Sequence, residues 1–132
     1  MLEEGEPPTS ARAIAAGGPG LVVALHGTYE WSGEAVDGFP GGPAWRAAVE
    51  QTAPNARHLA VHEGHLVALN DRDRVAIDEL APLMTSFGLS GTAADVRAKA
   101  EAFEAAGVTE LVYQPAGPDI ERELRALMDA VG

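Results

Sequence analysis

The last forty residues of the chain hold the pattern that most constrains its fold. Thr92 and Asp95 have the spacing of a capping box, which predicts a helix over Ala93–Ala106. Gly107 stands where a glycine commonly ends a helix. Apolar residues of the predicted helix recur at the spacing of one helical face, at Val96, Ala100 and Phe103. We therefore expect a well-defined helix here.

A predicted strand and a second helix follow at once. Val108–Gln114 is an apolar, β-branched run, which predicts a strand. Asp119 then caps a last predicted helix, whose apolar residues Ile120, Leu124, Leu127, Met128 and Val131 share one face. Helix, strand and helix joined by short connections are typical of an α/β protein with a parallel sheet.

The first half of the chain gives weaker signals. Thr9 or Ser10 is a possible N-cap for a short helix to Ala16, which the run of glycine and proline from 17 to 20 would end. Leu21 to Trp31 opens with a continuous apolar run that suits a strand buried on both faces, with a buried helix as the competing interpretation. Residues 55–75 have no clear period, and we expect them to be partly helical and irregular.

Composition limits the possible classes of protein. The 132 residues, 46% of them hydrophobic, suit one domain over 1–132. A formal net charge of -11 disfavours nucleic acid and anionic membranes as partners, because phosphates would be repelled. The chain has no cysteine, which excludes disulfides and thiolate chemistry. No apolar run is long enough to span a membrane, and we expect a cytoplasmic protein.

The carboxyl-terminal sequence also resembles a known family. The stretch SGTAADVRAKAEAFEAAGVTELVYQPAGPDIERELRAL, from Ser90 to Leu127, is similar to the end of the luciferase-like monooxygenases. These flavin- or deazaflavin-dependent oxidoreductases bind FMN or a deazaflavin coenzyme in a (β/α)8 TIM barrel. The resemblance implies that Met1–Gly5 ends the sixth barrel strand, that Leu21–Tyr29 is the seventh, and that Val108–Gln114 is the eighth.

A TIM barrel takes about 250 residues, so the chain resembles only the carboxyl-terminal half of such an enzyme. The expected fold class is α/β: a partial (β/α)8 TIM barrel of the last two to three β/α units, with an irregular insertion. Its open sheet edges would call for a homo-oligomer or a complementing chain. The implied function is that of a truncated oxidoreductase acting on a small-molecule substrate and inactive alone. The alternative is a small α/β binding or interaction module within a larger assembly.

The resemblance also suggests a pocket. His26 and Thr28 lie at the carboxyl end of the implied seventh strand, and Gln114 lies at the end of the eighth. In TIM barrels the ligand binds at these ends, so the three residues are candidates for contact with cofactor or substrate. For His26, the competing interpretation is a structural group that ends a buried strand.

Three further histidines raise the question of a metal site. On a helix, His58, His62 and His65 would share one face. However, Gly64 weakens a helix at this point, and the spacing is one residue short of the His-Glu-x-x-His motif. We interpret the three as surface or loop histidines and assign no metal site. No serine elbow and no phosphate-binding glycine motif occurs.

Overall fold

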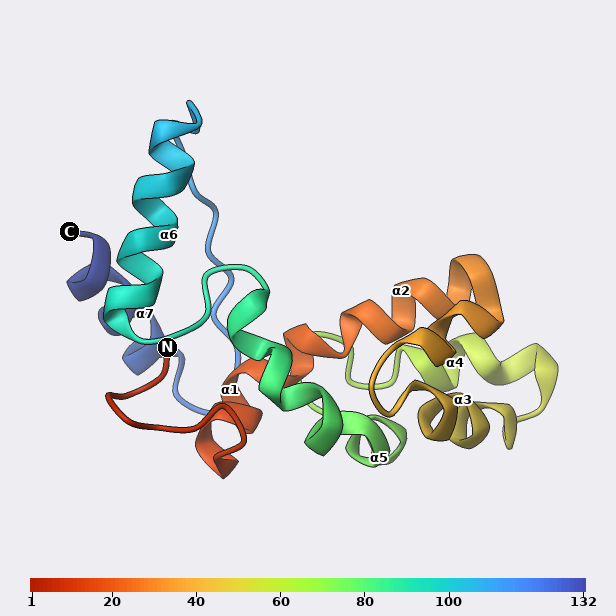
Figure 1. Ribbon diagram of the computed structural model, residues 1–132. Coiled ribbons are helices and arrows are strands. Elements are labelled where there is room, and N and C mark those ends of the chain that lie inside the picture. Colours follow the sequence, from red (N-terminus) through yellow and green to blue (C-terminus); the bar gives the residue numbers. More distant parts are fainter.

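The computed structural model describes residues 1–132, and every regular element in it is a helix (Figure 1). The α-helices are α1 (Ala11–Leu21), α2 (Val23–Ser32), α3 (Gly42–Glu50), α4 (Arg57–Val61), α5 (Asp71–Leu80), α6 (Ala93–Ala105) and α7 (Ile120–Val131), with 3-10 turns η1 (Gly33–Gly38), η2 (Pro54–Ala56) and η3 (Ala81–Ser86). None of the helices combines the length and the hydrophobicity that a membrane span requires. The predicted α/β class and the partial TIM barrel are therefore wrong, because the chain contains no strand, sheet or barrel.

The predicted strand from Leu21 to Tyr29 is helical, so the competing interpretation of this run was the right one. The buried residues are Leu21, Val22, Leu25 and His26. Their spacing is that of one helical face, whereas a strand buried on both faces would bury every residue of the run. Val23 and Ala24, on the other side of the helix, are only half-buried.

α1 extends five residues beyond its predicted end at Ala16. Of the two predicted N-cap candidates, Thr9 and Ser10, it is Ser10 that caps the helix, since its side chain accepts a hydrogen bond from the backbone N–H of Ala13. Gly17 lies in the helix because η3 packs closely there: a Cβ on Gly17 would lie 2.6 Å from Sδ of Met84. Gly17 and Gly18, which suggested a helix end, thus allow close packing instead.

Val108–Gln114 forms no strand either. The segment runs back beside α6 without helical turns (Figure 1), and no other segment pairs with it. Local sequence favours an extended backbone here, but a strand also needs a partner for its N–H and C=O groups. The predicted barrel would have provided neighbouring strands, and this chain contains none.

The hydrophobic residues gather in two clusters. The larger holds 13 buried residues from the first 84 positions, including Leu25, Trp45, Val61 and Leu80. The smaller joins α6 to α7 through Val96, Leu127 and Ala130. Figure 1 shows the corresponding shape: α2, α3 and α4 lie at one end, and α6 projects from the other.

The carboxyl-terminal helices begin as the sequence predicts. Thr92 and Asp95 form the capping box of α6, and the Asp119 side chain accepts from the N–H of Arg122 at the start of α7. An ion pair of 3.3 Å joins Arg12 of α1 to the buried Glu123 of α7. This contact ties the α6–α7 pair to the main body.

Candidate metal centre

Three imidazole rings meet at the end of the molecule formed by α2 and α4. Nδ1 of His26 lies 3.0 Å from Nδ1 of His65, and Nδ1 of His62 lies 3.4 Å from the same atom. One ring nitrogen from each of the three residues falls within 4.8 Å of the other two. We call this set of three residues the histidine cluster.

His26 is the buried member of the cluster and is held from two sides. It lies on α2 with 1% of its surface exposed, and its ring stacks on Trp45 of α3 at a centroid distance of 5.7 Å. Its Nε2 atom lies 2.9 Å from Oδ1 of Asp73, which is also fully buried. The same carboxylate oxygen accepts a hydrogen bond from the indole N–H of Trp45, at 3.0 Å. Packing and hydrogen bonding thus fix the position of the ring.

The buried carboxylate is placed by the start of α5. Asn70 caps this helix, and its side chain accepts from the N–H groups of Arg72 and Asp73. In return, Oδ2 of Asp73 accepts from the N–H of Asn70 at 3.2 Å. This reciprocal capping box uses Oδ2 and leaves Oδ1 available to accept hydrogen bonds from the rings of His26 and Trp45.

His62 and His65 come from the turn that follows α4. The helix ends at Val61, and Gly64 takes a positive φ of 72°, at which a Cβ would lie 2.7 Å from the carbonyl oxygen of Ala68. The sharp turn brings both rings back toward α2. Nε2 of His62 also lies 3.2 Å from Oε1 of Glu30, so a second carboxylate contacts the cluster from outside.

The proton positions follow from these contacts. An ionised carboxylate only accepts hydrogen bonds, so Nε2 of His26 carries the proton that it shares with Asp73. In the neutral ring Nδ1 is then a lone pair directed at His65. The contact of His62 with Glu30 favours the same arrangement in the second ring. Two lone pairs therefore face a single nitrogen of His65, which has one proton to give at most.

The surroundings of the third ring favour its neutral form. Burial lowers the pKa of His65, and the neighbouring imidazoles His26 and His62 lower it further, against an opposing effect of the Asp73 carboxylate. A neutral imidazole is the form that binds metals. His26 is buried, His65 is half-buried and His62 is exposed, so the cluster opens to solvent on one side.

The structure separates the residues that the resemblance had placed in one pocket. His26 joins the histidine cluster, whereas Thr28 is half-buried on α2 with no side-chain hydrogen bond. Gln114 lines a different cavity of about 360 Å³, which is mostly apolar and is walled by residues such as Leu21, Phe87 and Tyr113. None of the three cluster histidines lines that cavity.

The set of histidines in the cluster differs from the set that helical spacing would place on one face. His58 is exposed on α4 and lies outside the cluster, while His26, which comes 36 residues before His62, completes it. The only local part of the cluster in the sequence is the pair His62 and His65, which lie three positions apart around Gly64. Asp73 and Trp45, which hold His26, have no local signal in the sequence.

Fold and site together define a small all-helical protein with a partly open three-histidine cluster. A scan against protein-family models and searches of curated proteins and of solved structures found no match to this chain. The chemistry of the cluster is therefore the basis for a functional proposal.

Proposed function

We propose that this protein binds one Zn²⁺ ion through the side chains of His26, His62 and His65. The observation that carries the proposal is the convergence of three ring nitrogens within 4.8 Å. Tetrahedral zinc with Zn–N bonds of about 2.0–2.1 Å places two ligating nitrogens about 3.3 Å apart. The distances of 3.0 and 3.4 Å from His65 to its two neighbours lie close to that value.

The donor set supports zinc. Three neutral imidazoles suit Zn²⁺, whereas Mg²⁺ and Ca²⁺ require oxygen ligands. The two carboxylates add support, because metal-binding histidines usually donate their other ring N–H to a carboxylate or a carbonyl. Asp73 takes this place for His26, and Glu30 takes it for His62.

Three protein ligands leave a fourth position for water or another small molecule. Because His62 is exposed, we expect that position on the solvent side of the cluster. Zinc sites with three protein ligands and an open fourth position are typically catalytic. In such sites the ion lowers the pKa of the bound water to about 7. A zinc-bound hydroxide available at neutral pH is thus the chemistry that this arrangement supports.

The expected oxidoreductase function rests on the resemblance and not on the cluster. FMN or a deazaflavin coenzyme was implied by the resemblance alone, through the strand ends of a barrel that the helical fold does not contain. The expectation stays a prediction, and the histidine cluster supports zinc better.

The test is a calorimetric titration of the untagged protein with zinc chloride at neutral pH. We expect one zinc per chain, and we expect His65→Ala to weaken binding by at least about 100-fold, because removing a ligand costs more than the 10- to 100-fold typical of removing a ligand's hydrogen-bond partner. His58→Ala is the matched control, since it removes an exposed histidine from α4 outside the cluster.

The outcomes separate clearly. The control should bind zinc as tightly as the unaltered chain. Unchanged affinity in His65→Ala, or equal weakening in both variants, would place any bound zinc elsewhere on the surface and refute the site.

A further inference from the structure

The segment that follows α6 has a backbone without partners. The N–H of Val108 donates to the carbonyl of Phe103, but no backbone N–H or C=O group from Thr109 to Pro118 takes part in any hydrogen bond within the chain. Unpaired backbone groups in an extended segment are the template on which another strand adds. Proline first interrupts the row of N–H groups at 115, so the continuous edge runs from Thr109 to Gln114.

The apolar side chains between Val108 and Val112 suit a strand and are exposed. Val108, Leu111 and Val112 are exposed at 39%, 42% and 92%. β-branched and aromatic residues favour strands, and six residues is a usual strand length. Tyr113 packs against the small hydrophobic cluster, which anchors one end of the segment on α6 and α7. An added strand would therefore rest on a helical support, which isolated two-stranded ribbons lack.

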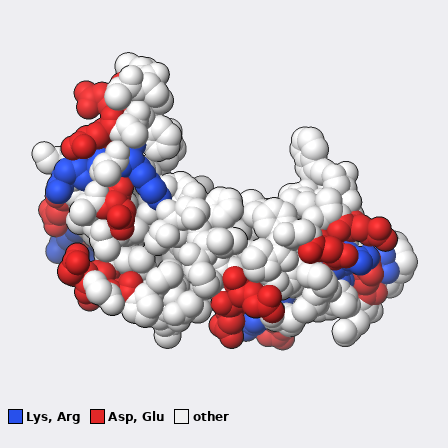
Figure 2. All heavy atoms as spheres, viewed as in Figure 1, with Lys and Arg blue, Asp and Glu red and all other residues white.

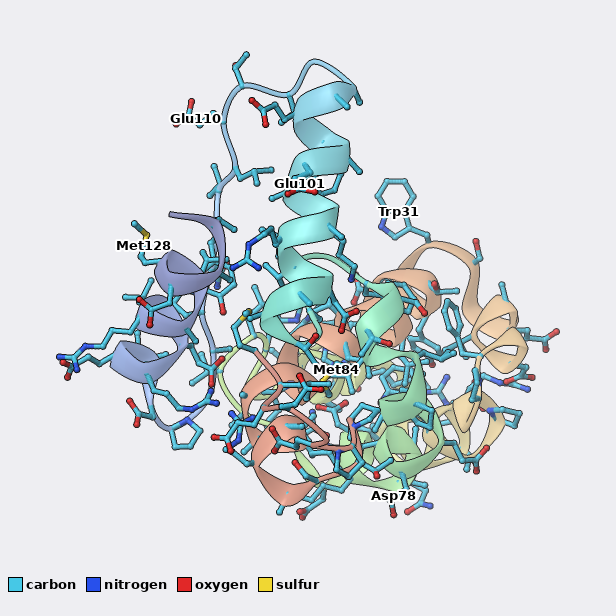
Figure 3. All side chains as sticks on the ribbon, turned by 60° about the vertical axis from the view of Figure 1, so that its left-hand side comes forward. Trp31, Asp78, Met84, Glu101, Glu110 and Met128 are labelled. Carbon is cyan, nitrogen blue, oxygen red and sulfur yellow. The ribbon has the colours of Figure 1, made fainter.

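The charge around the edge identifies the kind of partner. Between Glu101 and Val112 the chain carries three carboxylates, at Glu101, Glu104 and Glu110, and no Lys or Arg. All three are exposed, and Figure 3 shows Glu110 pointing away from α6. Figure 2 shows the same end of α6 with acidic but no basic atoms at its tip. A second copy of this chain, with its net charge of -11, would place like-charged carboxylates opposite one another, which is unfavourable.

We propose that Val108–Gln114 binds an extended, basic segment of another protein by β-strand addition. Val108, Glu110 and Val112 share one face of the extended segment, because side chains alternate between faces. The complementary strand has Lys or Arg opposite Glu110 and apolar residues opposite the two valines. Main-chain hydrogen bonds supply affinity, and the charged pair supplies register and selectivity. This inference does not depend on the zinc site.

The probe is a fluorescein-labelled peptide, Thr-Val-Thr-Lys-Thr-Val-Thr, measured by fluorescence anisotropy. We expect binding that weakens as salt rises, and slower amide hydrogen exchange from Thr109 to Tyr113 in the complex. A peptide with Glu in place of Lys should bind at least about tenfold more weakly.

Two pairs of variants test the mode of binding. Val112→Pro should weaken binding of the Lys peptide by at least about tenfold. Proline lacks the backbone N–H, which has no partner in the free protein and would donate to the added strand. Val112→Ala keeps that donor and should bind within a few-fold of the unaltered chain. Glu110→Lys should reverse the preference between the two peptides, whereas Glu79→Lys, the same change at an exposed site on α5, should not.

Circular dichroism should show native helix content in all four variants, since each changes an exposed side chain. The proposal fails if the Lys peptide does not bind, if both peptides bind equally, or if Val112→Pro binds as well as Val112→Ala. It also fails if sedimentation shows a homodimer that Val112→Pro dissociates, because the edge then serves a second copy of this chain.

Discussion

Asp73→Ala is expected to lower the free energy of unfolding by about 3–5 kcal/mol. The carboxylate is fully buried and receives hydrogen bonds from the rings of His26 and Trp45. Its removal leaves two buried ring N–H donors unpaired, at about 1–3 kcal/mol each, together with a small cavity. Loss of the capping contact to the N–H of Asn70 adds to the effect.

The matched control is Asp78→Ala, which removes an exposed carboxylate from the same helix (Figure 3). It should change stability by no more than about 0.5 kcal/mol. Urea unfolding followed by circular dichroism measures both values. Equal stability of the two variants would mean that the contacts of Asp73 are not formed in solution.

Zinc itself should stabilise the native protein strongly. At free zinc about 100-fold above its dissociation constant, binding to the native state alone raises the free energy of unfolding by about 2.7 kcal/mol. For a chain of this size that corresponds to a rise in Tm of roughly 10 °C. A scanning calorimeter measures the shift, and a chelator should reverse it.

The same scans with variants assign the stabilisation to the cluster. His58→Ala should keep the full shift, and His65→Ala should lose most of it. Asp73→Ala should lose part of the zinc-dependent rise in Tm, because metal affinity falls about 10- to 100-fold when a ligand loses its outer hydrogen-bond partner. A zinc shift of the same size in His65→Ala would contradict the assignment.

Local chemistry predicted the parts of the fold that depend only on neighbouring residues. The capping box of Thr92 and Asp95 and the cap at Asp119 are confirmed, and of the two candidates Thr9 and Ser10 the structure uses Ser10. A cap is a contact between residues three positions apart, so the sequence contains the whole interaction. The interpretation of Val108–Gln114 as a barrel strand was wrong because a strand depends on residues far away, and none pairs with it here.

The histidine cluster could not be assembled from the sequence for the same reason. His26 meets His65 across 39 positions, and Asp73 meets His26 across 47. Helical spacing grouped His58 with His62, but α4 ends at Val61 and the turn at Gly64 sends the chain toward α2 instead. The glycine that argued against a helical metal motif is the residue that makes the observed cluster possible.

X-ray absorption at the zinc edge of the protein with one equivalent of zinc tests the central claim most directly. The histidine cluster predicts three imidazole nitrogens at about 2.0–2.1 Å, with the multiple scattering typical of imidazole rings, and one further light atom in a four-coordinate site. A six-coordinate shell of oxygen atoms without imidazole scattering would contradict it.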